Sequence, residues 1–314
     1  MFINAIGYYI PEERVSNDYY TEKTGLSDDW LVQRTGIKTR SRAREDENVN
    51  TMSVDAVINT LPSLPYDIKE VDLIISSTYT PYDTVGTAAH FVQQQFGIVD
   101  AKAFTLSSAC SSFLNAMEII EGYFALGKAR KALIIGGDKN SAYNNESDPK
   151  SGHLWGDAAV ACFFSNERIT EHDYEVLDIH TEALGCLGKG PGGIMLHPRE
   201  KGIIMQDGID VFVKACACMP KIALFLLEKR GFTFEDLSYF IAHQANMRIL
   251  KNIANNIKLS EEKLLSNIEE LGNTGCASCA LVFAQNKDKF KKGELICLCV
   301  FGGGYSAGAC LISV

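Results

Sequence analysis

Short apolar runs alternate with amphipathic stretches along most of this chain. Residues 103–106 form an apolar run of strand length, and small residues follow it up to Cys110. Beyond it, apolar residues recur at helical spacing, which predicts a helix over about 110–126: Phe113, Met117, Ile120 and Phe124. Further buried strands are predicted at 71–78 and 131–138, and a further helix at 87–96. Strands that alternate with helices predict an α/β fold with a mostly buried sheet.

The second half of the chain repeats this order of elements. A strand is predicted at 236–243, a turn that opens an apolar helix at 273–278, and a strand that ends in glycines at 294–304. We therefore predict two pseudo-duplicated halves, residues 1–165 and 166–314. A glycine-rich stretch at 184–193 is predicted to form a long loop between strands.

Cys110 is the first candidate for chemistry. It lies at or just before the first turn of the predicted helix, where unpaired backbone N–H groups and the helix dipole favour an anion. Such a position is expected to lower the pKa of a thiol and so to favour the nucleophilic thiolate. The alternative is a buried cysteine that packs as a small apolar residue.

Three positions in the second half complete a candidate site. His243 stands where a predicted strand runs into a helix, and Asn273 lies in what we expect to be another strand-to-helix turn. Gly303 belongs to a triple glycine after a strand, where backbone amides could approach a substrate oxygen closely. The structural alternatives are a hydrogen-bonded core histidine, a helix N-cap and a sharp turn.

Composition narrows the classes of function. The 314 residues carry 39 Asp and Glu against 30 Lys and Arg, a net charge of −9, which argues against a nucleic-acid-binding protein. We predict no signal peptide, and no uninterrupted apolar stretch approaches the ~18 residues of a membrane span. Four cations between Lys38 and Arg44 fit either a solvated loop or an edge that faces an anion.

The cysteines indicate a reducing compartment rather than a metal or disulfide framework. Ten cysteines without regular framework spacing predict free thiols and a cytoplasmic location. Cys276 and Cys279 have the CxxC spacing of a zinc site, but other cysteine pairs lie on apolar runs. Because structural zinc wants four converging ligands, we predict no metal site.

Several motifs occur together in this chain. They are Asp29-Trp30 with Arg34-Thr35-Gly36-Ile37, Ala109-Cys110-Ser111-Ser112-Phe113, Trp155-Gly156-Asp157, His243-Gln244-Ala245-Asn246-Met247-Arg248, Gly272-Asn273-Thr274 and Phe301-Gly302-Gly303-Gly304. Through them, and over nearly its whole length, the chain resembles a β-ketoacyl-acyl-carrier-protein synthase III, a condensing enzyme of the thiolase superfamily. The resemblance implies a thiolase-like, five-layered αβαβα fold built from the two halves, and a homodimer.

The resemblance also implies roles for individual residues. Cys110, His243 and Asn273 match the catalytic triad, and the amides of Cys110 and Gly303 match the oxyanion hole. The positions that match coenzyme A contacts are Trp30, Arg34, Phe212, Ala245 and Asn246. Arg248 matches a position for carrier-protein docking. The acyl pocket is expected to include Trp155 and Val85. Trp155 stands where a phenylalanine is common, and Val85 replaces an aromatic residue that is often supplied across the dimer interface. Lys150 is the cation nearest to the place of a missing nucleotide-binding arginine.

The implied reaction is a decarboxylative Claisen condensation that initiates fatty acid or related acyl-chain synthesis. An acyl-CoA acylates Cys110, and the carbanion from malonyl-acyl-carrier protein attacks the acyl group, with no metal or redox cofactor. Two alternatives stay open. The enzyme could pass the acyl group from Cys110 to an oxygen, nitrogen or sulfur acceptor in a secondary pathway, or the chain could be a catalytically silent subunit that helps a partner bind carrier protein.

Overall fold

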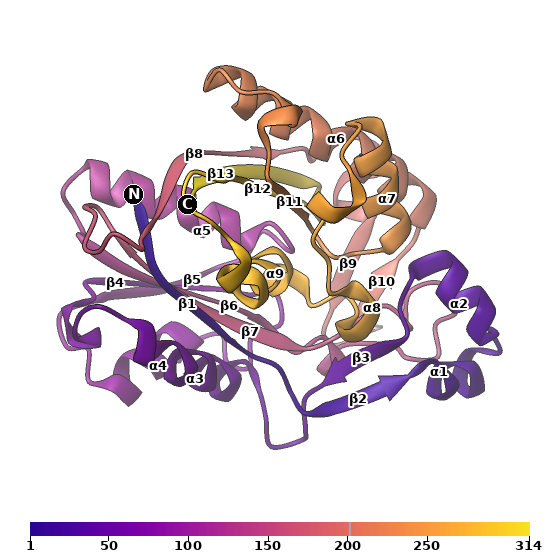
Figure 1. Ribbon diagram of the computed structural model, residues 1–314. Helices are drawn as coiled ribbons and strands as arrows, with labels where there is room; N and C mark the ends of the chain where they lie inside the picture. The colour runs from indigo at the N-terminus through magenta and orange to yellow at the C-terminus, as the bar shows by residue number, and fades with distance from the viewer. Residues whose placement is uncertain (201) are drawn as a thin grey trace.

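Five layers of alternating helices and sheets make up the computed structural model, which describes residues 1–200 and 202–314 (Figure 1). Nine strands are hydrogen-bonded in the order β11-β12-β13-β8-β1-β7-β6-β4-β5. One part of this sheet consists of β5 (Lys102–Leu106), β4 (Leu73–Ser77), β6 (Lys131–Asp138), β7 (Ala158–Ser165) and β1 (Phe2–Tyr9). The other part consists of β8 (Tyr174–Ala183), β13 (Ser306–Ser313), β12 (Leu295–Gly302) and β11 (Tyr239–Ala242).

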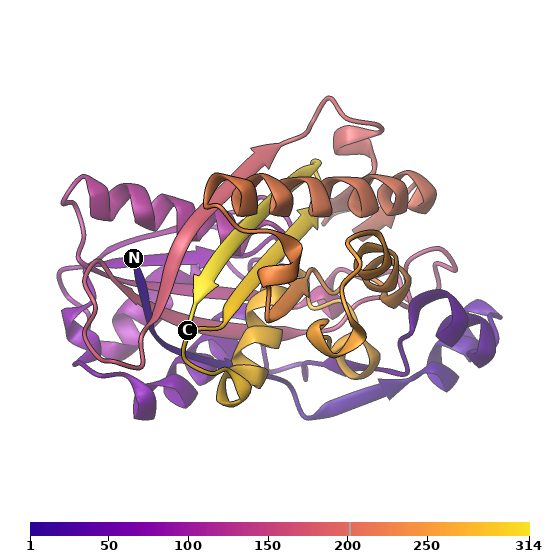
Figure 2. The same cartoon turned by 45° about the horizontal axis from the view of Figure 1, so that its top comes forward.

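The two parts of the sheet separate widely after a narrow junction. They meet only where Phe2 and Ile3 of β1 pair with Glu175 and Tyr174 of β8. The space between them is filled by α5 (Ser112–Ala125) and α9 (Ser278–Asn286), which form the central layer (Figures 1 and 2). The predicted five-layered αβαβα fold is therefore confirmed.

Helices cover both outer faces of the sheets. One face carries α3 (Val49–Thr60) and α4 (Ala88–Phe96), and the other carries α6 (Gly208–Lys229) with α7 (Met247–Asn256) beside it. Three smaller helices are α1 (Asn17–Thr24), α2 (Asp28–Thr35) and α8 (Ile268–Leu271). Two further sheets have two strands each: β2 (Glu13–Ser16) pairs with β3 (Thr39–Arg42) across α1 and α2, and β9 (Ile194–His197) pairs with β10 (Gly202–Met205). The 3-10 turns are Leu61–Ser63, Ile68–Glu70, Asn140–Ala142, Gly190–Gly192, Phe234–Asp236, Glu261–Lys263, Gly275–Ala277 and Lys287–Lys289.

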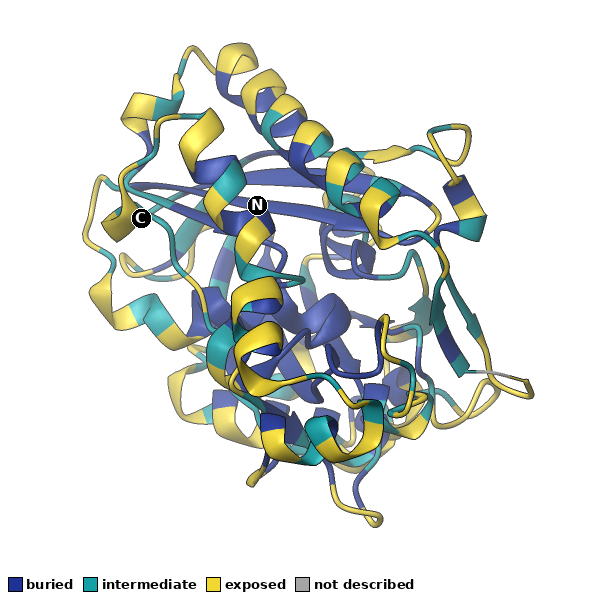
Figure 3. Ribbon diagram, turned by 90° about the vertical axis from the view of Figure 1, so that its right-hand side faces the viewer, coloured by how far each residue is buried: buried dark blue, intermediate teal, exposed yellow. Residues whose placement is uncertain are grey.

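Burial follows the sequence pattern. In α5 the predicted apolar stripe faces the core: Phe113, Met117 and Ile120 are buried, and Phe124 is half-buried. Every residue of α9 from Ser278 to Ala284 is buried, as expected of a helix between two sheets (Figure 3). Strands β4, β7 and β12 are buried throughout, and β6 is buried from Ala132 to its end, because helices cover both of their faces.

Every strand assigned up to Ser165 belongs to the β5–β1 part of the large sheet or to the β2–β3 pair. The first strand of the other part, β8, begins at Tyr174. The strand order is thus compatible with the boundary at residue 165, and the division into two domains stays a prediction. The halves are unequal, since the counterpart of β5 is reduced in the second half to one bridge between Phe240 and Leu264.

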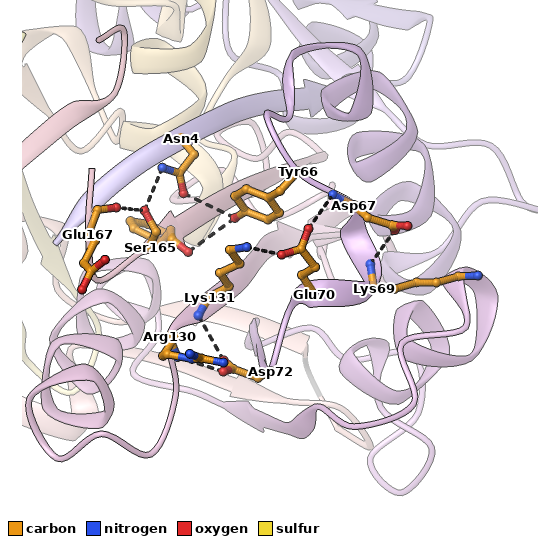
Figure 4. A network of polar contacts seen from close by, with 11 residues as sticks. Asn4, Tyr66, Asp67, Lys69, Glu70, Asp72, Arg130, Lys131, Ser165 and Glu167 are labelled. Atoms are coloured by element: carbon orange, nitrogen blue, oxygen red, sulfur yellow. Dashed lines mark hydrogen bonds and ion pairs between the residues drawn. The ribbon is translucent and has the colours of Figure 1, made fainter. Parts of the chain in front are cut away.

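The amino ends of the parallel strands form a purely structural edge. Asp72, just before β4, accepts hydrogen bonds from the backbone amides of Arg130 and Lys131, which lead into β6 (Figure 4). Beside them, Lys131 pairs with Glu70. These contacts fix the strands at one edge, and the candidate chemistry lies at the opposite one. Across residues 1–200 and 202–314, no helix combines the length and the apolar character needed to cross a membrane.

Candidate active site

Cys110 stands on a tight turn between the carboxyl end of β5 and α5. The preceding Ala109 has a φ of 51°, a left-handed conformation that is uncommon for a residue with a side chain. Ser112, the first residue of α5, holds the turn: its hydroxyl accepts from the Ser108 amide at 2.8 Å and donates to the Ala109 carbonyl at 2.6 Å. The turn therefore presents Cys110 immediately before the helix begins, as predicted.

The expectation of a lowered thiol pKa is wrong for the resting chain. Burial raises the pKa of Cys110 well above its usual range, and the nearby carboxylate of Asp138 raises it further. The backbone N–H groups of Cys110 and Gly303 act to lower the pKa of the thiol, but their effect is smaller than that of burial away from water. Cys110 is thus a protonated thiol before substrate arrives.

His243 follows β11 directly and is held in one orientation. Its amide donates to the Cys299 carbonyl of β12 at 2.8 Å, and its Nδ1 lies 2.7 Å from the Ser278 hydroxyl at the start of α9. Burial lowers the pKa of His243 to about 4. The imidazole is therefore neutral near pH 7, and contact with Ser278 occupies Nδ1 and leaves Nε2 for another partner.

Asn273 lies between two helices, so the expectation of a strand-to-helix turn is wrong. It follows α8 and precedes the 3-10 turn Gly275–Ala277. Its position is set instead by a distant segment, since its amide donates to Leu154 at 2.8 Å and its carbonyl accepts from Gly156 at 2.9 Å. Its Oδ1 accepts from the Gly275 amide at 3.0 Å, which directs the carboxamide and leaves the NH2 group available as a donor.

The triple glycine after β12 passes very close to the Cys110 turn. A Cβ at Gly302 would lie 3.0 Å from the Cys110 amide nitrogen and 3.1 Å from that of Ser111. Any side chain there would force the two turns apart, whereas glycine lets their backbones meet. The approach brings the triple glycine next to the Cys110 turn, and the backbone N–H groups of Cys110 and Gly303 both act to lower the pKa of the thiol, which makes them candidates for an oxyanion hole.

Two cavities meet at Cys110 and Trp155. A narrow one of about 90 Å3 contains Cys110, His243 and Asn273 in its lining, together with Phe212, Ala245 and Asn246. A wider one of about 530 Å3 extends from the other side of Cys110 along Tyr79, Ile194, Leu196 and Gly303. The three side chains that lie far apart in the sequence therefore converge on one cavity.

The residues expected to bind coenzyme A fall into two groups. Phe212, Ala245 and Asn246 line the narrow cavity. Trp30 and Arg34 lie outside its lining, on the exposed side of α2, with the guanidinium 5.7 Å from the indole ring. Arg248 is exposed near the start of α7, 5.7 Å from the Phe212 ring, so the expected docking residue lies next to a residue of the cavity wall.

Not every predicted residue lies at the cavities. Trp155 lines both of them, but Val85 is 85% exposed and lines neither in this single chain. Lys150 is exposed, and the side chain packed against Trp30 is that of His153, with ring centroids 5.8 Å apart. The contact of His153 with α2 could not be predicted from the sequence, because the residues around His153 show no pattern that indicates a helix more than a hundred residues away.

The cation-rich segment is only partly solvated. Lys38 and Arg44 are exposed, but Arg40 is buried in β3, where Nε donates to the His153 carbonyl at 2.6 Å and the guanidinium lies 4.6 Å from the Tyr20 ring. Arg42 pairs with Glu146. Arg40 and Arg42 thus hold β3 against the segment that precedes Trp155.

Comparisons with known proteins agree with this geometry. Residues 104–185 match the family model described as 3-oxoacyl-[acyl-carrier-protein (ACP)] synthase III, and residues 227–314 match the model of its C-terminal part. The chain is 32% identical over 319 residues to the β-ketoacyl-[acyl-carrier-protein] synthase III of Prochlorococcus marinus strain MIT 9215, covering 98% of this chain and 94% of the relative. It is 34% identical over 312 residues to the protein of that name from Aquifex aeolicus strain VF5, covering 99% of this chain and 98% of the relative. The crystal structure of the 3-oxoacyl-[acyl-carrier-protein] synthase III of Aquifex aeolicus VF5 superposes with a TM-score of 0.93 at 31% identity, covering 100% of this chain and 99% of that one.

Proposed function

We propose, from the premise that this chain belongs to the β-ketoacyl-[acyl-carrier-protein] synthase III family, that it condenses an acyl-CoA primer with malonyl-acyl-carrier protein. It is an acyl-transferring condensing enzyme, and the reaction initiates fatty acid synthesis. The observation that carries the proposal is the convergence of Cys110, His243 and Asn273 on one cavity. The following steps give each of these residues a role.

The first step transfers the acyl group from coenzyme A to Cys110. The sulfur attacks the thioester carbonyl, the bond to the coenzyme A sulfur breaks, and the proton lost by Cys110 ends on the released coenzyme A thiol. The carbonyl oxygen becomes an oxyanion between the amides of Cys110 and Gly303, which face the same sulfur. A preorganised donor of this kind contributes roughly 2.7–4 kcal/mol to the transition state in comparable sites.

The second step uses the other two side chains. Malonyl-acyl-carrier protein loses carbon dioxide, and the electron pair of the broken bond forms an enolate on the thioester carbonyl. We assign Nε2–H of His243 and the NH2 of Asn273 as donors to that oxygen, because Ser278 holds Nδ1 and Gly275 holds Oδ1. The neutral imidazole suits this role, since it donates without giving up its proton. The carbanion then attacks the acyl carbon, the bond to the Cys110 sulfur breaks, and the thiolate takes a proton from solvent to restore the resting thiol.

The substrates explain the arrangement around the cavity. Phe212, Ala245 and Asn246 would contact the pantetheine arm, and Trp30 with Arg34 would hold the nucleotide end on α2. Arg248 would receive the acidic carrier protein, and Trp155 would border the acyl chain. The steps need no metal or redox cofactor.

Assembly and location belong to the same proposal. A homodimer would place Val85, 85% exposed in the single chain, where a second copy can cover it. A cytoplasmic location is supported by the ten cysteines, all of which are free thiols.

Two measurements test the proposal. Incubation with a panel of acyl-CoA thioesters should add one acyl mass to Cys110, and no adduct would favour the silent subunit instead. Wild type should release carbon dioxide from malonyl-acyl-carrier protein, and Asn273→Ala should release it far more slowly while still becoming acylated. Acylation without any carbon dioxide release by wild type would favour transfer to an oxygen, nitrogen or sulfur acceptor.

A further inference from the structure

A buried carboxylate lies behind the candidate site and has no part in the proposed steps. Asp138 ends β6, is fully buried, and forms no salt bridge within residues 1–200 and 202–314. Removing an unpaired charge from water costs free energy unless hydrogen bonds replace the solvent. Hydrogen bonds must therefore stabilise this carboxylate in place of water.

Five donors from two separate turns converge on Asp138. Its Oδ1 accepts from the turn after β4, namely from the hydroxyl and amide groups of Thr78, Tyr79 and Thr80 at 2.9 to 3.2 Å. Its Oδ2 accepts from the Cys276 amide at 2.8 Å, in the 3-10 turn that follows Asn273. One carboxylate thus joins a turn of the first half to the Asn273 turn of the second.

The contact with the second turn is tight. Gly275, which donates to Oδ1 of Asn273, approaches Asp138 so closely that a Cβ there would lie 2.2 Å from Oδ2. The carboxylate therefore limits where the Gly275 amide, and with it the Asn273 carboxamide, can sit.

We infer that Asp138 is a positioning residue: its carboxylate, which accepts from the Cys276 amide and lies against Gly275, fixes the Asn273 carboxamide relative to Cys110. The inference rests on the proposed function for the role of Asn273. The groups that face this charge are Tyr79 from the β4 turn, Cys276 from the 3-10 turn and Cys110, which also faces Cys279.

The charge of Asp138 provides a second readout. Burial raises the pKa of Asp138 to about 6, and the hydrogen bonds from Cys276 and Tyr79 act to lower it. The carboxylate is therefore mostly charged above pH 7. After burial, its charge is the largest influence that raises the pKa of Cys110.

The test is Asp138→Asn, which keeps the shape, removes the charge and sets an NH2 group against N–H or O–H donors. We expect decarboxylation of malonyl-acyl-carrier protein to fall by about tenfold to a hundredfold, the loss of one hydrogen bond to a charged group. Acylation of Cys110 by acyl-CoA should persist or accelerate. Labelling of Cys110 by iodoacetamide, located by peptide mass, should become faster at a given pH near 7, because the thiol ionises more readily.

A matched control is Asp173→Asn. Asp173 is also buried and accepts from Asn4, Ile169 and Thr170, but at the opposite edge of the sheet, where Asn4 also donates to Ser165. This variant should lose stability and keep the wild-type ratio of decarboxylation to acylation. Thr78→Val removes one donor to Asp138 and keeps the charge of the carboxylate. It should lower the ratio of decarboxylation to acylation less than Asp138→Asn does, and it tests the same role if Asp138→Asn does not fold.

The outcomes distinguish a failure of the positioning role of Asp138 from a failure of the proposed function. An unchanged ratio of decarboxylation to acylation in Asp138→Asn and in Thr78→Val overturns the positioning role. A wild type that releases no carbon dioxide contradicts the proposed function instead, and the labelling experiment still decides whether Asp138 acts on Cys110.

Discussion

Gly302→Ala tests the contact between the triple-glycine loop and the nucleophile turn. The added Cβ would lie 3.0 Å from the Cys110 amide and 3.1 Å from both the amide and the hydroxyl of Ser111. The Cys110 turn cannot yield easily, because Ser111 is fully buried and its hydroxyl lies 2.7 Å from that of Ser306. The loop must therefore move by a few tenths of an ångström away from Cys110, and the Gly303 amide moves with it.

The expected effect follows from the oxyanion. Loss of one such donor costs about 2.7–4 kcal/mol in comparable sites, a factor of roughly 10²–10³ in rate. Because Gly303 is displaced rather than removed, we expect acylation of Cys110 to slow by about a hundredfold. The assay is the first-order rate of adduct formation with acyl-CoA, followed by intact-protein mass.

Gly308→Ala is the matched control on the neighbouring strand. A Cβ there would meet Thr181 at 3.1 Å and Leu114 at 3.4 Å, a comparable crowding that does not touch the Cys110 turn. Both variants should lose similar stability, and only Gly302→Ala should lose acylation. Wild-type acylation in Gly302→Ala, or equal slowing in both variants, would refute the reasoning.

Three further predictions address the core, the histidine and the thiol. Phe113→Ala should lower the free energy of unfolding by about 3–5 kcal/mol in urea titrations, because the ring is buried between the sheets; a loss below about 1 kcal/mol would contradict that placement. Ser278→Ala should slow decarboxylation about tenfold while sparing Cys110 acylation, since Nδ1 of His243 loses its partner; equal slowing of both steps would argue against a role for His243 in the enolate. Burial raises the pKa of Cys110, so its iodoacetamide labelling should rise about tenfold per pH unit from about pH 7 to 9; a plateau within that range would show that the thiolate already predominates.

The architecture was predictable because its signals are local. The runs that become β4, β6 and β12 are mostly apolar and of strand length, as buried strands are. In α5, Phe113, Met117 and Ile120 recur at the spacing of one helix face. The turn before α5 was predictable for the same reason, since small residues separate a strand pattern from a helix pattern.

The details of the site depend on contacts between distant segments. Asn273 is positioned by Leu154 and Gly156, so its local sequence could not reveal that it follows a helix. The pKa of Cys110 depends on burial and on Asp138, neither of which is visible in the residues of its own turn. Arg40 shows the same limit: a cation in a charged run becomes buried because Asn17, Tyr20 and the His153 carbonyl surround it.

A single-turnover experiment tests the central claim most directly. Cys110 is first acylated with an acyl-CoA, excess reagent is removed, and malonyl-acyl-carrier protein is added. We predict that the acyl group leaves Cys110 at the rate at which carbon dioxide and β-ketoacyl-carrier protein form, one for each adduct lost. Departure of the acyl group to water or to another acceptor, without a new carbon–carbon bond, would contradict the account.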